Sequence, residues 1–464
     1  MDFEFSSEET IAAIATAVAV GKGGIAIIRI SGPSAKAIAR EIIITPSNKA
    51  WESHQVLYGY VMDQGANKRI DEVLTIFMKG PKSFTGEDVV EIHCHGGVIA
   101  VDQVLERILA NSKVRRALPG EFSQRAVLNN RISLTQAEAI SDLVAARSRK
   151  AAQIAMFGLE GMTQKRMLKL RETLLDQLSE IEARVDFEDE MPPLNGEQLL
   201  KNILNIQENL VSLINDSNQA ECYKNGFKVG IVGRPNVGKS SLLNRLCKYD
   251  RAIVNHVPGT TRDSLESEVI LKGIPINLID TAGIRNTDNE VEKLGIERSH
   301  QVMMTADLAI LIFDLNIGWT KDDSAIFREI PTDIPRLLIG NKCDISKKKA
   351  DLNLIIDHKA IKLDVIFSAI TGEGESDLID RLIEKCGASQ QENLQIVFNQ
   401  RQKDLALKAS ESLGRIQQVA LEKLPWDFWT IDLREAIHYL GEITGEEITE
   451  AVLDRIFSRF CIGK

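Results

Sequence analysis

The chain has 464 residues, of which 44% are hydrophobic and 26% charged, the ordinary composition of a globular protein. That length is sufficient for about three domains. The net charge of −10 argues against a broadly basic surface that coats nucleic acid, but it allows a local groove for a specific RNA. No apolar run approaches the roughly 20 residues that a membrane span requires. The acidic N-terminus and six scattered cysteines predict no signal peptide, reduced thiols and a cytoplasmic protein.

The N-terminal segment has the pattern of a mixed α/β domain. Alternating apolar runs predict strands over 9–16, 24–30, 72–78 and 88–93, and a helix over 98–111. His93 and His95 flank Cys94, which places both histidines on one strand face. One interpretation of this triplet is a metal site. We favour an ordinary strand, because no further ligand cluster accompanies the two histidines.

A helical segment follows. From about residue 133 to 185, apolar residues recur at helical spacing while glycine and proline are nearly absent, which predicts long amphipathic helices. Pro192-Pro193 interrupts the pattern. Helices are predicted to resume over 197–214, 392–423, 431–440 and 450–459. We expect the helices on both sides of the central segment to pack into one domain.

The central segment opens with the most informative motif, Gly233-Arg-Pro-Asn-Val-Gly-Lys-Ser240, a complete G-x-x-x-x-G-K-S phosphate-binding loop. An apolar run precedes it and a helical pattern follows it, the strand–loop–helix context that the motif requires. Lys239 would reach the β- and γ-phosphates, and the Ser240 hydroxyl would bind Mg²⁺. We predict nucleotide contacts by six successive residues: Asn236, Val237, Gly238, Lys239, Ser240 and Ser241.

Three later motifs specify the base and the γ-phosphate. Asn341-Lys342-Cys-Asp344 follows an apolar run, and its Asp carboxylate would accept two hydrogen bonds from guanine that adenine cannot donate. Ser368-Ala369 would lie behind the base. The third motif, Asp280-Thr281-Ala282-Gly283, follows the strand-like run 276–279. Its Asp would hold a water ligand of the metal, its Gly would touch the γ-phosphate, and all four residues are predicted nucleotide contacts. Taken in order, these motifs resemble those of the translation-factor-related GTPases.

The hydrolytic apparatus departs from that of Ras-like GTPases. Ile284 stands where those proteins carry the Gln that orients the attacking water, and an apolar side chain cannot orient water. Glu290 and Glu292 are the nearest carboxylates that could act instead. The alternative is that both glutamates lie on a solvated helix face.

More than one group could neutralise the negative charge that develops on the phosphates during hydrolysis. Arg262 and Arg285 could act as arginine fingers in cis. A monovalent cation beside Asn236, completed by backbone carbonyls of the loop 255–262, could supply the same charge. Thr261 in that loop would contact Mg²⁺.

The chain ends Phe460-Cys461-Ile-Gly-Lys464. This is not a prenylation box, because the residues after the cysteine lack an aliphatic pair. One interpretation is a frayed terminus. The other is that the amphipathic run 456–460 pins the end, so that the Cys461 thiol beside Lys464 is reactive or binds a ligand.

The whole chain resembles the MnmE (TrmE) family, the tRNA-modification GTPases of bacteria and organelles. The motifs that carry this resemblance are spread along the sequence: Ser83-Phe-Thr-Gly-Glu-Asp88, His95-Gly-Gly97, Pro119-Gly-Glu-Phe-Ser123, Gln136-Ala-Glu-Ala-Ile140, Gly259-Thr-Thr-Arg-Asp263, Leu440-Gly-Glu-Ile-Thr-Gly445 and the C-terminal Cys-Ile-Gly-Lys.

The resemblance implies that the N-terminal domain binds a tetrahydrofolate derivative (5,10-methylene- or 5-formyl-) and forms a homodimer. The matching folate positions are Arg29, Glu91, Arg131 and Lys464, and relatives often carry Lys where Arg131 stands. The stretch Val18-Ala-Val-Gly-Lys-Gly-Gly24 departs from the Pro-Pro-Gly-Arg-Gly-Gly of many relatives. Lys22 keeps the charge there, but the prolines are replaced.

For the GTPase, the resemblance implies K⁺-dependent dimerisation of the GTPase domains. The matching K⁺ positions are Asn236, Asn255, Val257 and Thr260, and Thr260 joins Thr261 in the nucleotide site. Mg²⁺ would bind to Ser240 and Thr261. Glu292 matches the glutamate that orients water, and Cys461 is a candidate catalytic thiol of unsettled role.

The implied fold is multidomain α/β plus all-α. It has an N-terminal α/β domain for tetrahydrofolate binding and dimerisation (1–124), a helical domain in two parts (125–222 and 387–464), and an inserted Ras-like P-loop GTPase domain with a mostly parallel sheet (223–386). The implied function is addition of an aminomethyl or carboxymethylaminomethyl group at C5 of the wobble uridine of certain tRNAs. An MnmG (GidA)-like partner carrying FAD would form a heterotetramer or larger complex, with no membrane involved.

Two alternatives remain open from the sequence. One is a ribosome-assembly GTPase resembling Era or Der, whose GTPase motifs look similar but which lack the folate-like domain and the Cys-Ile-Gly-Lys end. The other is a folate-binding regulator whose GTPase is a switch without chemistry on RNA.

Overall fold

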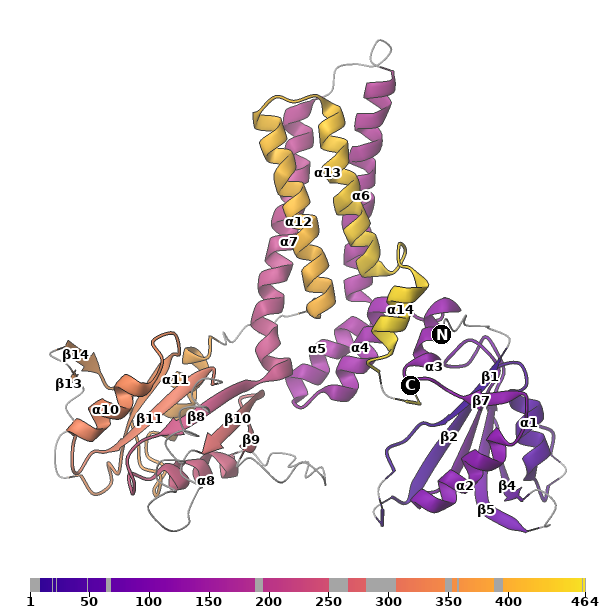
Figure 1. Cartoon of the computed structure of the whole chain (residues 1–464), viewed down its shortest axis with the longest axis horizontal. Coiled ribbons are helices and arrows are strands. Elements are labelled where there is room, and N and C mark those ends of the chain that lie inside the picture. Colours follow the sequence, from indigo (N-terminus) through magenta and orange to yellow (C-terminus); the bar gives the residue numbers. More distant parts are fainter. Residues whose placement is uncertain are drawn as a thin grey trace. The chain divides into compact units, whose positions relative to one another are not determined.

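The structure is a computed structural model that describes most of the chain. The described residues are 9–18, 20–21, 23–47, 49–63, 68–187, 195–249, 266–280, 306–346, 353–356, 359–387, 395–460 and 462–463. The chain divides into two compact units (Figure 1). Unit 1 comprises Met1–Ser141, Gly158–Glu208 and Asp404–Lys464, and unit 2 comprises Asp142–Phe157 and Asn209–Lys403.

Unit 1 begins with a seven-stranded sheet in the order β3-β4-β5-β6-β2-β1-β7. Its strands are β1 (Thr10–Ile14), β2 (Ile25–Ser31), β3 (Ile43–Ile44), β4 (Val56–Met62), β5 (Arg69–Met78), β6 (Val89–His95) and β7 (Val114–Arg116). β1 and β7 pair in parallel, whereas the other neighbours pair antiparallel. The four strands expected in this region are therefore confirmed, and β3, β4 and β7 are additional.

Helices α1 (Ala35–Ile42) and α2 (Val98–Leu109) cover one face of this sheet (Figure 1). α2 buries apolar residues at helical spacing: Val101, Val104, Leu105 and Ile108. They pack against inward-facing strand residues such as Ile28 and Ile92. Burying each such side chain contributes about 1.5–3 kcal/mol. This apolar face fixes the register of the strands, because a slip of one residue would exchange the two faces.

The opposite face of the sheet is covered at β1 by α3 (Glu121–Leu128), whose Phe122 packs with Ile11 and Ala13. Residues of β2 and β6 that alternate with the core positions also face this side. They include the predicted folate residues Arg29 and Glu91. We refer to this side as the open face.

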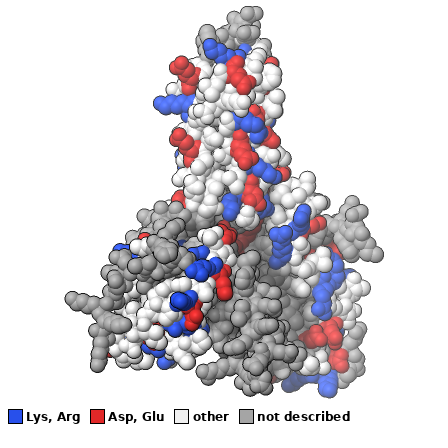
Figure 2. Space-filling model, turned by 60° about the vertical axis from the view of Figure 1, so that its left-hand side comes forward, with Lys and Arg blue, Asp and Glu red and all other residues white. Residues whose placement is uncertain are grey.

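The rest of unit 1 is helical. The helices that contribute to it are α4 (Leu134–Ala145), α5 (Arg149–Leu159), α6 (Met162–Asp186), α7 (Gly196–Asn225), α12 (Gln400–Leu421), α13 (Trp426–Thr444) and α14 (Glu450–Phe457), with parts of α4, α5, α7 and α12 assigned to unit 2. α6, α7, α12 and α13 lie side by side as a bundle (Figure 1), so helices from both sides of the central segment pack together. Figure 2 shows acidic and basic side chains interspersed along this bundle.

The predicted helices differ from the observed ones in extent. The stretch 133–185 forms three helices rather than fewer long ones, and Gly161 precedes the last of them, α6. Within α6, Leu174 is fully buried but Leu175 is 36% exposed. α7 runs to Asn225, beyond the predicted end at 214. α12 begins at Gln400 rather than 392.

Unit 2 contains a six-stranded sheet in the order β15-β12-β11-β8-β10-β9. Its strands are β8 (Phe227–Val232), β9 (Glu266–Leu271), β10 (Ile274–Asp280), β11 (Leu308–Asp314), β12 (Arg336–Asn341) and β15 (Val365–Ile366). Only β9 runs antiparallel to its neighbour among these described strands, so the prediction of a mostly parallel sheet is confirmed.

Besides the parts of α4, α5, α7 and α12 named above, the described part of unit 2 contains three helices and a hairpin. They are α8 (Lys239–Tyr249), α10 (Lys321–Glu329), α11 (Glu375–Lys385), β13 (Asn353–Ile356) and β14 (Lys359–Lys362). The core beneath α8 and α11 is apolar and includes Ile231, Ile310 and Leu382. β11 is buried along its entire length, as strands covered on both faces are.

Two further findings bear on the predictions. Within the described residues, no helix has the length and hydropathy needed to cross a membrane. The four domain ranges stay predictions, because the two units divide inside α4, α5, α7 and α12 rather than at the predicted boundaries.

Candidate functional sites

The phosphate loop connects β8 to α8 at the carboxyl edge of the parallel sheet. Gly238 has φ +105°, and a Cβ there would lie 2.2 Å from Asn341 Nδ2, so only glycine fits. Asn236 also has positive φ, at +63°. Ser240 and Ser241 are exposed in the first turn of α8, where backbone N–H groups are free to meet an anion.

Lys239 lies within this loop and is nearly buried. Its Nζ donates to the carbonyls of Gly233, at 2.6 Å, and Arg234, at 2.8 Å. The ammonium is thereby held on the inner side of the loop, where the motif requires it for the phosphates. Its contact with the phosphates stays a prediction.

Arg234 of the loop is tied to α10, a contact that the sequence did not indicate. Its Nε donates to Asp323 Oδ1 at 2.8 Å, and the Asp323 side chain is fully buried. Asp323 also closes a capping box with Thr320 at the start of α10. The loop is therefore braced by a charge-assisted hydrogen bond to a helix terminus.

The Asn341–Asp344 motif lies beside the loop, at the end of β12. Asn341 is buried; its Nδ2 donates to the Val237 carbonyl at 2.8 Å, and its Oδ1 accepts from Ala369 N–H at 3.0 Å. This one amide therefore joins the phosphate loop to the Ser368-Ala369 segment. The phosphate loop, the Asn341–Asp344 motif and the Ser368-Ala369 segment therefore lie next to one another.

The carboxylate of Asp344 is exposed, and the Ser368 hydroxyl donates to it at 2.7 Å. Ser368 is fully buried, so it fixes the carboxylate from behind. Lys342, at φ +67°, pairs through Nζ with Asp314 at 2.7 Å. The geometry leaves the Asp344 oxygens available to a base that presents two adjacent donors.

Most of the residues that are predicted to bind the metal or to act in hydrolysis lie outside the described residues. Asp280 ends β10 opposite Ile231 of β8, which places its backbone beside the strand that leads into the phosphate loop. The remaining predicted residues lie outside the described residues: Asn255, Val257, Thr260, Thr261, Thr281, Ala282, Gly283, Ile284, Glu290 and Glu292, with Arg262 and Arg285.

A second polar site lies on the open face of the N-terminal sheet. Arg29 of β2 and Glu91 of β6 are directly paired across the strands. The guanidinium donates from Nε to Glu91 Oε1 at 2.9 Å, its Nη2 lies 2.8 Å from the same oxygen, and both side chains are 18% exposed. The two predicted folate residues therefore form one ion pair that a ligand can reach.

Aromatic rings and the chain end surround Arg29. The guanidinium lies 5.0 Å from the Phe84 ring centroid and 5.6 Å from that of Phe122. Its Nη1 donates to the Gly463 carbonyl at 3.5 Å. Gly463 is buried and lies beside Arg29, which favours the interpretation of a held chain end over a frayed one; Cys461 and Lys464 lie outside the described residues.

Arg131 approaches the same region from the end of α3. Its Nε donates to the Ser83 carbonyl at 3.1 Å, next to Phe84 in the chain. Arg131 is otherwise exposed. It thus holds the 83–88 loop while its remaining guanidinium donors stay available to an anion.

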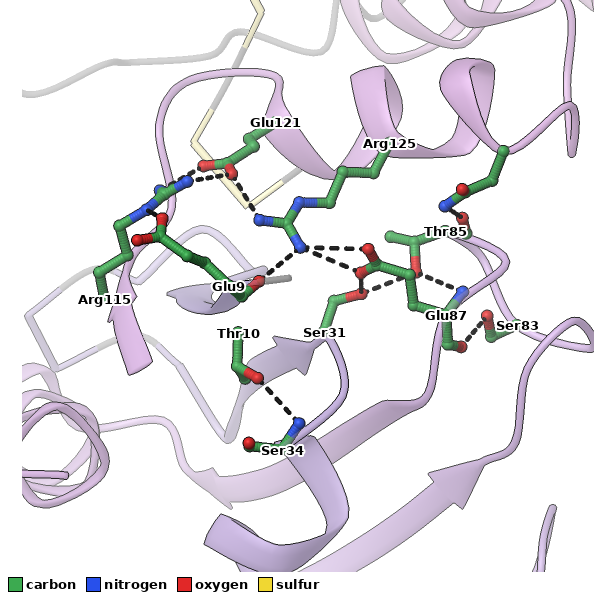
Figure 3. Close-up of polar contacts among 11 residues, drawn as sticks. Glu9, Thr10, Ser31, Ser34, Ser83, Thr85, Glu87, Arg115, Glu121 and Arg125 are labelled. Atoms are coloured by element: carbon green, nitrogen blue, oxygen red, sulfur yellow. Dashed lines mark hydrogen bonds and ion pairs between the residues drawn. The ribbon is translucent and has the colours of Figure 1, made fainter. Parts of the chain in front are cut away.

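A buried ionic network stands behind this loop and links four segments of the chain (Figure 3). Arg125 donates to Glu121 Oε1 at 2.9 Å, to both Glu87 oxygens at 3.2 Å and to the Glu9 carbonyl at 2.7 Å. The Ser31 hydroxyl donates to Glu87 Oε2 at 2.7 Å. Because Phe84 and Phe122 belong to the segments that this network fixes, it positions the rings around Arg29.

Glu121 is the most deeply buried carboxylate of the network. Burial alone would raise its pKa, but hydrogen bonds from Arg115, the Leu118 N–H and Arg125 outweigh burial and hold the pKa below its ordinary value. Arg115 contributes two of these bonds, at 2.7 and 2.8 Å. Glu121 is therefore held as a carboxylate near neutral pH, paired with both Arg115 and Arg125.

The His93-Cys94-His95 triplet lies on β6 beside this site. The described residues contain no group of three or more His, Cys, Asp or Glu side chains able to hold a metal ion. His95 Nδ1 instead lies 2.6 Å from Asp71 Oδ1, and that hydrogen bond raises the pKa of His95. Cys94 points into the core, where burial raises its pKa to about 12.

The parallel sheet, the phosphate loop and the exposed Asp344 carboxylate of the Asn-Lys-x-Asp motif together define unit 2 as a P-loop GTPase. Two family models match the chain: MnmE helical domain over residues 134–461, and GTP-binding protein TrmE N-terminus over residues 10–131. A tRNA modification GTPase MnmE of Prochlorococcus marinus (strain MIT 9303) is 60% identical over 459 residues, which cover 98% of each chain. That of Parasynechococcus marenigrum (strain WH8102) is 57% identical and covers 99% of this chain and all of the relative.

Solved structures match over shorter stretches. Aquifex aeolicus Era bound to GDP and AlF₄⁻ is 22% identical over 40% of this chain and 66% of that chain, with a TM-score of 0.29. The G domain of the T. maritima FeoB iron transporter is 32% identical over 34% of this chain and 98% of that domain, with a TM-score of 0.25. The relatives that match along the whole length decide the family: the chain belongs to the MnmE family of tRNA modification GTPases.

Proposed function

We propose that this protein hydrolyses GTP to drive a modification at C5 of the wobble uridine in certain tRNAs, and that it holds the one-carbon donor on its own N-terminal sheet. The observation that carries the proposal is the Arg29–Glu91 pair, a reachable ion pair beside the chain end, in a chain that separately contains a guanine-nucleotide site. The curated relatives are named tRNA modification GTPases, which supports the same role.

The nucleotide site fits GTP with Mg²⁺. Lys239 and the first turn of α8 would hold the phosphates, Asp344 would bind the guanine edge, and Ser240 would contact the metal. Thr261, Asp280 and Gly283 would complete the contacts to Mg²⁺ and the γ-phosphate. The bound metal would neutralise charge on the phosphates, while this chain's own residues position them.

The open-face site fits a reduced folate such as 5,10-methylene- or 5-formyl-tetrahydrofolate. A pterin ring presents an N–H and an amine side by side, which suits the Glu91 carboxylate. Phe84 and Phe122 offer apolar ring surface, while Arg131 and Lys464 are cations for the folate's carboxylates. The folate would supply a one-carbon unit, and an FAD-carrying MnmG-like partner would supply the redox chemistry.

The homodimer is proposed through the N-terminal domain. Val56, Tyr58 and Leu74 are exposed on the open face, and Tyr58 and Leu74 are paired across β4 and β5. Exposed apolar side chains that adjoin on a sheet face are typical of contacts between protein chains. An assembly of the homodimer with the MnmG-like partner and tRNA would then bring the donor and the uridine together.

For hydrolysis, we propose that Glu292 orients the attacking water and that K⁺ binds at Asn236, Asn255, Val257 and Thr260. Replacing Glu292 by Ala should leave GTP affinity unchanged and slow single-turnover hydrolysis by roughly a hundredfold or more, because a positioned general base is lost. Near-normal turnover would exclude Glu292 from that role.

The K⁺ proposal has its own measurement. Hydrolysis should be markedly faster in K⁺ than in Na⁺ at equal ionic strength, since a cation beside the phosphates would supply the positive charge that an arginine finger supplies in other GTPases. Equal rates in the two salts would remove the cation from the mechanism. Cys461 remains a candidate thiol, for which no chemical step is proposed.

The central proposal is tested by nucleoside mass spectrometry on tRNA from cells that lack this gene. The aminomethyl and carboxymethylaminomethyl uridines should disappear and return with the intact gene. Unchanged wobble uridines would remove the modification role, while leaving the GTPase assignment in place.

A further inference from the structure

His93 carries a ring nitrogen that the protein does not satisfy. His93 follows Glu91 by two residues on β6, so both side chains face the open side of the sheet. Its Nε2 lies 3.9 Å from Glu91 Oε2, too far for a hydrogen bond. That nitrogen is buried and has no hydrogen-bond partner among the described residues.

The neighbours of His93 explain why no side chain serves it. Its cross-strand neighbours are Ile27 on β2 and Leu74 on β5, both apolar. The nearby charges are already engaged, because Glu91 binds Arg29 and Asp71 binds His95. Buried polar groups are nearly always paired in folded proteins, so an exception beside a ligand-accessible ion pair needs an explanation.

The imidazole is placed where a ligand of the Arg29–Glu91 site would reach it. The His93 side chain is 25% exposed, and rotation about its Cβ–Cγ bond, which is a soft torsion, turns a ring nitrogen toward the open face. Residues two apart on a strand are about 7 Å apart. That spacing suits a flat, fused two-ring heterocycle with polar atoms along one edge.

We propose that His93 is a ligand-positioning residue of this site, whose ring nitrogen hydrogen-bonds a heteroatom of a flat heterocycle while Glu91 accepts from the heterocycle's adjacent N–H groups. The inference rests on the folate site proposed above and adds a residue to it. A neutral imidazole supplies either a donor or an acceptor to a ring nitrogen or carbonyl. Leu74 and Ile27 supply apolar contact on either side.

The test replaces His93 by Leu in the full-length chain and titrates 5-formyl-tetrahydrofolate by calorimetry. Affinity should fall about tenfold, the equivalent of one lost hydrogen bond. The unfolding temperature should stay the same or rise, because an unpaired buried nitrogen is replaced by an apolar group. His93→Gln, which keeps a donor and an acceptor, should restore affinity to within about threefold of the wild type.

A matched control is His95→Leu, the same substitution on the same strand face. Its nitrogen is already bound by Asp71, so affinity for the probe should remain within about twofold. If the wild type binds the probe and His93→Leu binds it equally, the inference is wrong and the folate proposal stands. If the wild type does not bind, the folate proposal itself fails.

Two further outcomes would also overturn the role of His93. A lower unfolding temperature in His93→Leu, without rescue of affinity by Gln, would assign His93 to the structure of the sheet. Weakened self-association with unchanged probe affinity would mean that a second copy of this chain satisfies the nitrogen.

Discussion

The guanine-nucleotide site is assembled where strands of one parallel sheet end, whereas the Arg29–Glu91 site lies across the face of an antiparallel sheet. In the first, each functional group follows its own strand, and short contacts such as Asn341 to the Val237 carbonyl join neighbouring loops. In the second, the groups come from β2, β6, α3 and the chain end. The first site is thus made of local motifs, and the second depends on distant segments meeting.

This difference predicts how the two sites respond to substitution. A change in a motif of the nucleotide site should act on that motif's ligand and leave the sheet intact. A change around Arg29 should act through the packing of several segments, because the Glu87–Glu121–Arg125 network holds them together. Substitutions in the nucleotide site should therefore change ligand specificity, whereas substitutions in the network around Arg29 should change the stability of the fold.

The largest effect is expected at Asp344, the carboxylate proposed to bind the guanine edge. Asp344→Asn should weaken GDP binding by roughly a hundredfold or more, since the two guanine donors lose a charged acceptor and meet an amide donor. Binding of XDP should improve, because xanthine presents a carbonyl where guanine has its amine. Titration with fluorescent analogues of the two nucleotides measures both constants.

The exposed Asp333→Asn provides the matched control, and it should change neither constant. Affinity of the nucleotide-free protein for 5-formyl-tetrahydrofolate should stay within about twofold in both variants. If Asp344→Asn kept its affinity for GDP, the base would be bound by other residues. The nucleotide site could then no longer serve as the example of a site made of local motifs.

The nucleotide site could be predicted from the sequence because its chemistry is contiguous. Gly233 to Ser240 fixes a loop, a lysine and a helix start within one short segment, and the structure places Lys239 inside that loop. The hydrogen bond between Asn341 and the Val237 carbonyl was not predicted, because the two residues lie 104 positions apart. The Arg234–Asp323 contact was not predictable, because an arginine and an aspartate 89 residues apart carry no local signal.

The open-face site could not be assembled in that way. The strands over 24–30 and 88–93 were predicted, but their register, which pairs Arg29 with Glu91, depends on packing that one sequence does not display. Only the family resemblance named both residues. β4 was not predicted, because Gly59 weakens its strand pattern, and the rings of Phe84 and Phe122 appeared as motif residues without a role.

An intermediate effect is expected at the pinned chain end. Gly463 has φ +93°, and a Cβ there would lie 2.3 Å from the Ile14 carbonyl oxygen. Gly463→Val should therefore displace the chain end from Arg29 and lower the affinity for 5-formyl-tetrahydrofolate about tenfold, as one or two polar contacts are lost. GTP affinity should not change.

Gly387→Val is the control for that experiment, because Gly387 also has positive φ, at +72°, but no atom of the described residues lies within 4 Å of the position that a Cβ would take. It should carry a similar backbone strain and leave folate affinity unaltered. Unchanged affinity in Gly463→Val would indicate that the chain end only lies beside the site and that Lys464 is not a folate contact.

The smallest effect concerns pH and the buried network. The pKa of Glu121 is lower in the folded protein than in the unfolded chain, so its stabilising contribution is complete above the unfolded value and is lost as pH falls through the folded value. The N-terminal sheet should therefore lose hydrogen-exchange protection as the pH drops below about 4.5. In Glu121→Gln, protection near pH 7 should be lower and the decline with acid shallower, whereas the exposed Glu106→Gln should follow the wild type. If hydrogen-exchange protection in Glu121→Gln declined with acid as it does in the wild type, the network would not hold the segments around Arg29. The contrast between the nucleotide site, made of local motifs, and the Arg29–Glu91 site, made of distant segments, would then rest on geometry alone.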